Sequence, residues 1–293
     1  MNHGADDRRS VWMLVSSMVI FGTIGVFRKL LPFSSAFLAF SRGILGSLCI
    51  LIYIRLSKGR TARDKLPRRT LLQLVVSGIF IGINWILLFE AYNHTTVAVA
   101  TLCYYMEPTI VMLLSPLVFK EKLTSKKLVC AAAAIAGMVL VSGVIGDSGA
   151  QGSQFRGILP GLGAAVFYSA VVIMNKRIRG IDAWRKTAVQ LFAAGAVMIP
   201  YLLLTGGFGG AEFTPSAAAL LLIVGIVHTG IAYVLYFGSM DGLRVQTVAI
   251  LSYIDPVSAL LFSAFLLREP LSVLKIVGAV MIIGSAAVSE ASS

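Results

Sequence analysis

Charged residues are scarce in this 293-residue chain, because Asp, Glu, Lys and Arg together make up only 13% of it, against roughly 25% in soluble proteins. Hydrophobic residues make up 57%, and the mean hydropathy is +0.87. A water-soluble domain needs polar residues on the outer faces of its helices, and long stretches of this sequence have none. The composition therefore excludes an ordinary soluble protein and indicates a chain whose solvent is the lipid bilayer.

Cysteine is also rare, and the common catalytic motifs are missing. Cys49, Cys103 and Cys130 lie in apolar segments and form no CxxC pair, so they indicate neither a disulfide framework nor a metal site. No phosphate-binding loop, HExxH motif or Gly-x-Ser-x-Gly motif is present. We therefore expect no cofactor, no metal and no catalytic residues, and the chain is not predicted to be an enzyme.

Ten apolar segments are long enough, at about 20 residues each, to cross the hydrocarbon core of a membrane. They are continuously apolar and rich in Leu, Ala, Ile and Gly, whereas the strands of a membrane barrel alternate over about ten residues. The sequence predicts an all-α integral membrane protein with transmembrane helices at residues 12–31, 35–56, 71–92, 95–119, 125–145, 156–176, 183–205, 215–238, 245–267 and 271–289.

The net charge of +12 would suggest nucleic-acid binding in a soluble protein, but here the basic residues lie in short loops between apolar segments. If the N-terminus is cytoplasmic, nineteen of the 25 basic residues, Lys176 and Lys186 included, fall on the cytoplasmic side. The positive-inside rule therefore predicts a multi-pass protein of the cell (inner, cytoplasmic) membrane with both termini in the cytoplasm. Its expected partners are lipid and a small-molecule substrate rather than nucleic acid, and a monomer and a homodimer both stay open.

An internal repeat relates residues that are 148 positions apart. Tyr105-Met106-Glu107-Pro108 matches Tyr253-Ile254-Asp255-Pro256, and Lys120-Glu121-Lys122-Leu123-Thr124 matches Arg268-Glu269-Pro270-Leu271-Ser272. Each unit contains five spans, and an odd number means that the second unit enters the membrane from the opposite side. The sequence thus predicts two inverted five-helix repeats, at residues 1–147 and 148–293, joined by the polar segment 146–153.

Ten spans in two copies of five, Arg42 in the second span, Glu107-Pro108 in the fourth and the turn at Lys120 to Thr124 resemble the EamA-type transporters of the drug/metabolite transporter superfamily. The resemblance covers nearly the whole chain. It implies transport, and export as the direction, but that family carries amino acids, amines, nucleotide derivatives and other metabolites. It therefore does not name the substrate.

Two carboxylates are predicted near the middle of the bilayer, since Glu107 lies about twelve residues into the fourth span and Asp255 about ten into the ninth, at 1.5 Å per residue. A charge at that depth is costly unless it faces a wet cavity, finds a partner or is protonated. Pro108 and Pro256 are predicted helix breaks, which would leave the carbonyls of Tyr104 and Ser252 without their helical donors. The structural alternative is that both acids only accept hydrogen bonds at proline kinks.

Arg42 and Glu90 are placed at similar depths near the outer ends of the second and third spans, where they could form an ion pair. Arg42 could instead bind a substrate carboxylate, and the sequence leaves both interpretations open. Polar and aromatic residues in the same spans could line a pocket for an amphiphilic or cationic solute. These candidate site residues are Asn84, Trp85, Tyr104, Tyr105, Tyr168, Asn175, Tyr233 and Tyr253.

The sequence favours a secondary active transporter that moves a small polar or amphiphilic metabolite by alternating access. An amino acid or amine is favoured, because Glu107 or Asp255 could exchange a proton for an ammonium group while Arg42 orients an anionic group. Protons as the coupling ion stay open. The alternatives are an anionic metabolite carrier centred on Arg42 and, less favoured, an intramembrane enzyme that uses Glu107 and Asp255.

Overall fold

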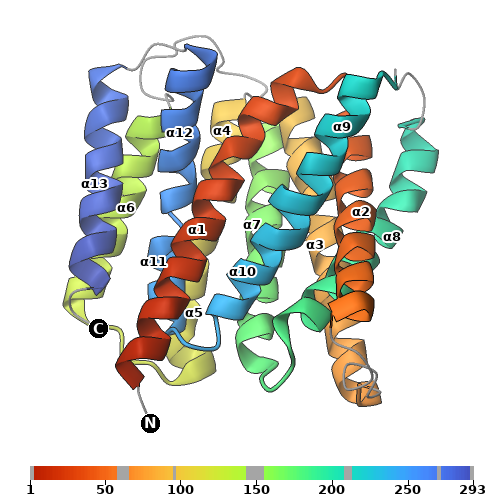
Figure 1. The fold of residues 1–293 in the computed structure, drawn as a ribbon. Coiled ribbons are helices and arrows are strands. Elements are labelled where there is room, and N and C mark those ends of the chain that lie inside the picture. The colour runs from red at the N-terminus through yellow and green to blue at the C-terminus, as the bar shows by residue number, and fades with distance from the viewer. Residues whose placement is uncertain are drawn as a thin grey trace.

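The computed structural model describes residues 3–57, 66–94, 97–142, 155–207, 213–268 and 272–290, and it forms a single bundle of helices (Figure 1). The first half contains α1 (His3–Leu30), α2 (Ser35–Ser57), α3 (Arg68–His94), α4 (Val97–Tyr104), α5 (Glu107–Phe119) and α6 (Ser125–Ser142). The second half contains α7 (Phe155–Arg177), α8 (Ala183–Thr205), α9 (Pro215–Ile223), η2 (Val224–Ile231), α10 (Ala232–Ser239), α11 (Val245–Leu251), α12 (Ile254–Leu267) and α13 (Val273–Glu290).

Some predicted spans are interrupted, which the hydropathy pattern did not reveal. The fourth span is α4 and α5, separated at Tyr105 and Met106, and the ninth is α11 and α12, separated at Ser252 and Tyr253. The eighth is α9, the π-helix η2 and α10. Within the described residues, eight segments are long and apolar enough to cross a membrane, and α13 contains a shorter apolar helix at Val273–Ser285. Helix α6 is the equivalent of α13 in the first half. The predicted all-α, ten-span membrane fold is confirmed.

The repeat offset of 148 reappears in the helix boundaries. Adding 148 to the bounds of α2 gives those of α8, and adding it to the bounds of α6 gives those of α13. The packing follows the same relation, because α3 contacts α7 and α8 while the equivalent span, η2 with α10, contacts α1 and α2. The equivalent pairs α2 with α8 and α6 with α13 pack against each other. Two related five-helix units therefore form the bundle. The predicted boundary at residues 147 and 148 lies outside the described residues.

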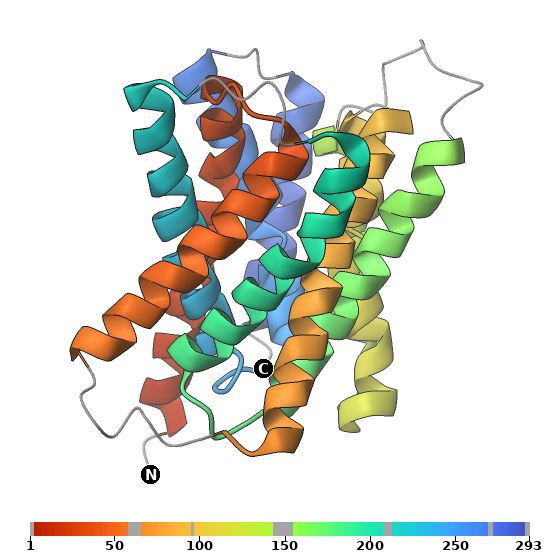
Figure 2. The same ribbon diagram turned by 90° about the vertical axis from the view of Figure 1, so that its right-hand side faces the viewer.

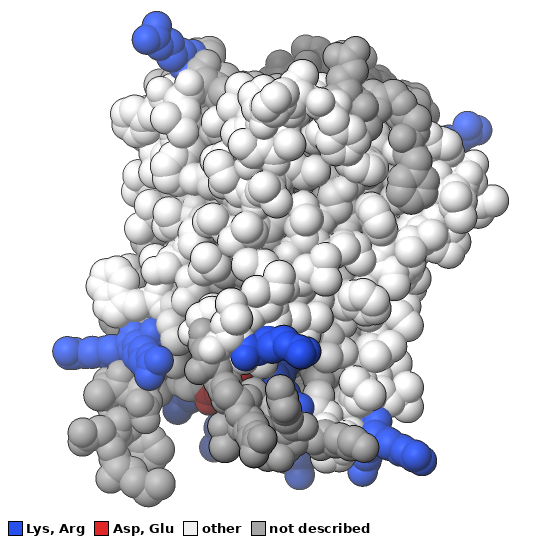
Figure 3. All heavy atoms as spheres, turned by 45° about the vertical axis from the view of Figure 1, so that its right-hand side comes forward, with Lys and Arg blue, Asp and Glu red and all other residues white. Residues whose placement is uncertain are grey.

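The two ends of the bundle differ in charge. Helix α1 begins, and α13 finishes, at the same lower end in Figures 1 and 2. Most of the Lys and Arg side chains visible in Figure 3 gather around this end. We call it the basic end; Arg55, Arg68, Lys126, Arg185 and Arg244 belong to the helix ends and turns located there. The positive-inside rule predicted from the sequence that the end with most of the Lys and Arg residues is the cytoplasmic one.

Small residues let α3 and α8 approach closely. A Cβ atom added at Gly78 would lie 2.4 Å from the carbonyl oxygen of Gln190 and 2.7 Å from the Cβ atom of Ala193. One added at Gly82 would lie 2.1 Å from a methyl carbon of Val197 and 2.8 Å from the carbonyl oxygen of Ala194. Backbone atoms cannot move aside as the end of a flexible side chain can. The contact between these helices therefore depends on the absence of side chains at the two positions.

We expect Gly78→Ala to lower the free energy of unfolding by about 1 to 3 kcal/mol, the usual cost of overpacking a close contact. The matched control is Gly25→Ala in α1, because a Cβ atom at Gly25 meets no atom within 4 Å. That control should be neutral or slightly stabilising, since Ala is the better helix former. Thermal unfolding in detergent compares the two, and equal melting temperatures would contradict the close contact between α3 and α8.

Candidate functional site

The breaks in the fourth and ninth spans position the two intramembrane carboxylates. Glu107 is the first residue of α5, and Asp255 is the second residue of α12. Both acids therefore lie at a helix N-terminus, where backbone N–H groups and the helix dipole favour negative charge. Helix α5 runs from its break towards the basic end, and α12 runs from its break towards the opposite end (Figure 1). The inverted repeat thus presents two equivalent N-termini, each with its own acid.

Hydrogen bonds join the two breaks across the repeats. The hydroxyl of Tyr105 donates to Oδ2 of Asp255 at 3.0 Å, and the hydroxyls of Thr109 and Tyr253 are 2.7 Å apart. Glu107 is buried, with 6% of its surface exposed, and it lies within electrostatic range of Tyr253. Because Tyr105 and Tyr253 are equivalent in the repeat, each tyrosine reaches into the other half of the protein. The two break segments are therefore in contact, through Tyr105 with Asp255 and through Thr109 with Tyr253.

The backbone at the break in the ninth span corrects the prediction about the carbonyl of Ser252. The carbonyl of Ser252 was expected to lose its donor, because Pro256 has no N–H group. That expectation is wrong, since the N–H of Asp255 donates to this carbonyl at 3.2 Å. At the break the backbone forms a hydrogen bond between residues i and i+3, as in a 3₁₀ turn, in place of the α-helical bond between residues i and i+4. The Ser252 carbonyl therefore has a hydrogen-bond donor despite the proline.

A series of tyrosine rings lies near the two acids. Tyr104, Tyr168 and Tyr236 form a connected series, with ring centroids 6.0 Å apart for the first pair and 6.4 Å for the second. Glu107 lies within electrostatic range of all three rings, and Asp255 within that of Tyr104 and Tyr236. Rings arranged around a carboxylate provide π faces that suit an ammonium group. Tyr236 of the eighth span thus belongs to this cluster.

Arg42 forms a second polar centre, on α2. Its Nε atom donates to Oγ1 of Thr229 at 3.1 Å, and its guanidinium lies 5.1 Å from the ring centroid of Trp85. Tyr233 lies within electrostatic range of Arg42, and its ring packs against Phe237, which also packs against Tyr236 of the tyrosine series. A cationic centre and an acidic centre are therefore connected through aromatic side chains.

The described contacts give Arg42 and Glu90 different partners, so they do not include the ion pair that was one of the two interpretations left open by the sequence. Glu90 accepts a hydrogen bond from the hydroxyl of Tyr201 at 2.8 Å, and its other oxygen lies 3.7 Å from Nε2 of His94. Arg42 instead faces Thr229, which the π-helix η2 positions. The side chain of Thr229 accepts from Arg42 while donating to the carbonyl of Val224, five residues earlier. Glu90 thus belongs to a separate contact between α3 and α8.

The two predicted asparagines lie in helix contacts. Nδ2 of Asn84 donates to the carbonyl of Ala164 at 2.7 Å and so connects α3 to α7. Nδ2 of Asn175 donates within α7 to the carbonyl of Val171, and the backbone carbonyl of Asn175 accepts from Nζ of Lys186. Asn175 therefore lies about two helical turns from Tyr168 towards the basic end. The structure brings neither asparagine into a hydrogen bond with Glu107 or Asp255.

Two lysines counted among loop cations are buried at the basic end. Lys186 has no exposed surface, and Lys176 is 6% exposed. Nζ of Lys176 donates to the carbonyls of Met240 and Leu243 in the turn before α11. Oε1 of Glu121 accepts from the N–H of Val245 at 3.2 Å, at the start of α11. The Lys176 contacts lie within the second half, whereas the bond between Glu121 and Val245 and the packing of α5 on α11 join the two halves at the basic end.

Comparison with known proteins agrees with this architecture. The sequence model of the EamA-like transporter family matches residues 8–143 and again residues 155–290. An uncharacterized transporter YxxF of Bacillus subtilis (strain 168) is 30% identical over 251 residues, which cover 86% of this chain and 79% of that protein. Protein PecM of Dickeya dadantii is 27% identical over 215 residues, covering 71% and 69%. A solved crystal structure of 21% identity superposes with a TM-score of 0.82 over 97% of this chain and 99% of the other.

The fold and these similarities define a multi-pass membrane protein that transports a small molecule. The chain belongs to the EamA-like transporter family, because the family model matches both of its halves. The resemblance stated from the sequence is thereby confirmed, and so is the prediction of transport. The relatives are described as transporters, which is consistent with the expectation that the chain is not an enzyme.

Proposed function

We propose that this protein is a secondary active transporter for amino acids or related amines, and that Glu107 and Asp255 form its ammonium-binding and coupling site. The observation that carries the proposal is the pair of carboxylates at equivalent helix breaks of two oppositely directed spans, joined through Tyr105 and Asp255. Half-helix N-termini and interrupted spans at the interface between repeats are where secondary transporters bind substrates and coupling ions. An intramembrane acid is by default a functional group.

Arg42 supplies the second half of the proposed recognition. An amino acid carries an ammonium and a carboxylate, and the site offers an acidic centre and a guanidinium that lies over Trp85 and within electrostatic range of Tyr233. A guanidinium forms two parallel hydrogen bonds with a carboxylate. An amine without a carboxylate would use the acidic centre alone. Export and proton coupling belong to this proposal, with the basic end and both termini on the cytoplasmic side of the cell membrane.

The inverted relation between the two five-helix halves supports the proposal of alternating access. In this structure α5 and α11 pack together at the basic end, where Oγ of Ser115 accepts from Nε2 of Gln246 at 2.7 Å. By the repeat relation the equivalent half-helices are α12 and α4, at the other end of the bundle. Closing one pair while the other separates would open the carboxylate site to one side at a time.

The test is a thermal-shift screen of the purified protein with amino acids, amines, nucleosides and phosphorylated metabolites, followed by flux measurements in liposomes. Stabilisation and flux by ammonium-bearing solutes are expected. Stabilisation only by anions without an ammonium group would favour the carrier centred on Arg42. A solute that is chemically converted without crossing the membrane would favour an intramembrane enzyme instead.

A further inference from the structure

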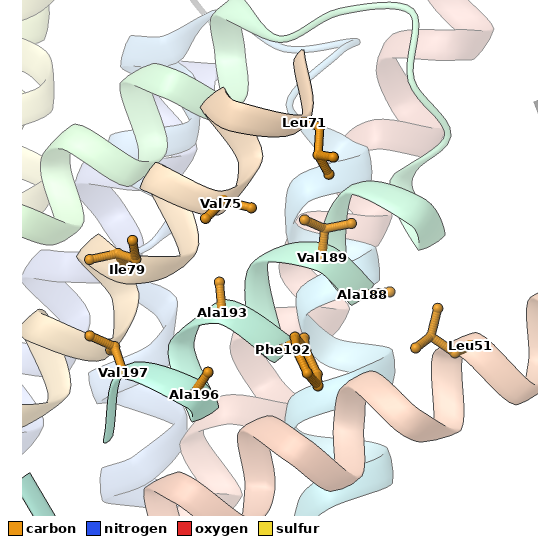
Figure 4. Close-up of a pocket in the computed structure, with 10 residues that line it drawn as sticks. All are labelled: Leu51, Leu71, Val75, Ile79, Ala188, Val189, Phe192, Ala193, Ala196 and Val197. Carbon is orange, nitrogen blue, oxygen red and sulfur yellow. The ribbon is translucent and has the colours of Figure 1, made fainter. Parts of the chain in front are cut away.

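A groove on the membrane-facing surface lies apart from the proposed transport site. It has a volume of about 620 Å³ and is lined by α2, α3 and α8. Figure 4 shows Leu71, Val75 and Ile79 of α3 on one side and residues of α8, Phe192 among them, on the other, with Leu51 of α2 at the edge. Every lining residue is Leu, Ile, Val, Ala or Phe, so the groove offers no hydrogen-bonding side chain to a polar solute.

The groove faces outward in the membrane-spanning part of the bundle. Leu51, Leu71 and Phe192 are 46%, 42% and 53% exposed, and they lie in the spans formed by α2, α3 and α8. Its floor is the close contact between α3 and α8, where Ala193 packs beside Gly78. In a bilayer the adjoining medium is hydrocarbon, so an acyl chain has the chemistry and shape to fill such a furrow.

Each of the three helices carries an arginine on its groove-lining stripe, at the basic end. Arg55 follows Leu51 by four residues, Arg68 precedes Leu71 by three, and Arg185 precedes Ala188 by three. On a helix, residues three or four apart lie on the same face. The three helices that line the groove therefore each carry one arginine towards the basic end, and we call Arg55, Arg68 and Arg185 the rim. Arginine matches the geometry of a phosphate group, to which it can donate two hydrogen bonds.

We propose that the groove between α2, α3 and α8 is a binding site for an anionic phospholipid of the leaflet at the basic end. One acyl chain lies along the α3 and α8 stripes, and the phosphate is held by the rim of Arg55, Arg68 and Arg185. The charge at the rim favours an anionic lipid over a second copy of the protein as the occupant, because two copies would bring like charges together. The site lies outside the proposed transport path and does not depend on the identity of the substrate.

The experiment measures lipid binding to the purified full-length protein by native mass spectrometry, with dioleoyl phosphatidylglycerol and dioleoyl phosphatidylcholine as probes. The wild type is expected to bind phosphatidylglycerol at least tenfold more tightly. The triple variant Arg55→Gln/Arg68→Gln/Arg185→Gln should bind it about a hundredfold more weakly, at about fivefold per basic residue near an anionic membrane surface. The matched control Lys122→Gln/Lys126→Gln/Arg244→Gln removes the same charge from exposed positions at the same end and should retain wild-type affinity.

Two further variants keep the test decisive. Arg55→Lys/Arg68→Lys/Arg185→Lys preserves the charge and should recover most of the binding, which separates loss of charge from loss of folding. Ala196→Phe fills the groove and should weaken the binding of both lipids about tenfold. Equal affinity for the two lipids, or equal behaviour of the glutamine variant and its control, would overturn the proposal. So would an Ala196→Phe protein that loses a dimer but keeps its lipid, because a second copy would then occupy the groove.

Discussion

Glu107→Gln is expected to abolish measurable transport while leaving a folded protein. The substitution keeps the size of the side chain and removes the negative charge that would face a substrate ammonium. Truncating one partner of a buried, hydrogen-bonded charge pair costs about 2 to 5 kcal/mol, which corresponds to a thirtyfold to several-thousandfold weaker interaction. Asp255→Asn should act in the same direction, since its carboxylate holds the equivalent position and accepts from Tyr105.

The pH dependence provides a second readout for Glu107. A carboxylate that binds an ammonium must be deprotonated, so protons and substrate compete for it. Wild-type binding is therefore expected to strengthen as the pH rises and to weaken in acid, and the Glu107→Gln protein should lose this dependence. Asp182→Asn is the control, because Asp182 caps α8 at an exposed position and Asn is an equally good cap. Wild-type flux with an unchanged pH profile in Glu107→Gln would remove the proposed mechanism.

Arg42→Ala is expected to divide the substrates into two groups. Amino acids should bind about ten to a hundred times more weakly, because a hydrogen bond to a charged group contributes about 1.5 to 3 kcal/mol. Amines that lack a carboxylate should bind nearly as well as to the wild type, since they use only the acidic centre. Binding constants for an amino acid and its decarboxylated amine, measured on the same protein, provide the comparison.

Arg42→Lys separates charge from geometry in that experiment. Lysine retains the positive charge but not the planar pair of donors, so it should recover part of the amino-acid affinity. Thr229→Val is the positioning control, because it removes the 3.1 Å contact with Nε and leaves the guanidinium itself in place. If the amine and the amino acid lose affinity equally in Arg42→Ala, Arg42 has a structural role and receives no substrate carboxylate.

The number and order of the spans could be predicted from the sequence, because both follow from local properties. Twenty apolar residues with few charges have essentially one stable state in a bilayer. The offset of 148 between the Glu-Pro and Asp-Pro segments was sufficient to predict the inverted repeat, and the bounds of α2 and α8 agree with it to the residue.

The breaks and the side-chain partners could not be predicted in the same way. Proline indicated an irregularity near Glu107 and Asp255, but the π-helix η2 contains no proline, and it packs against α1 and α2. An ion pair between Arg42 and Glu90 was one of two interpretations for Arg42, and it rested on depth alone. Depth leaves the rotation of each helix open, and η2 turns Thr229 rather than an acid towards the guanidinium. Lys186 was counted as a loop cation because its burial depends on how α7 and α8 pack.

Accessibility of the carboxylate site from the two sides of the membrane tests the central claim most directly. Ser252→Cys introduces a thiol at the break before Asp255, in a chain whose Cys49, Cys103 and Cys130 are replaced by serine or alanine. A membrane-impermeant maleimide is then applied to either side of oriented vesicles. The account predicts labelling from both sides, with rates that change in opposite directions when a transported substrate is added. Labelling from one side only, unaffected by substrate, would contradict a site that opens alternately to each side.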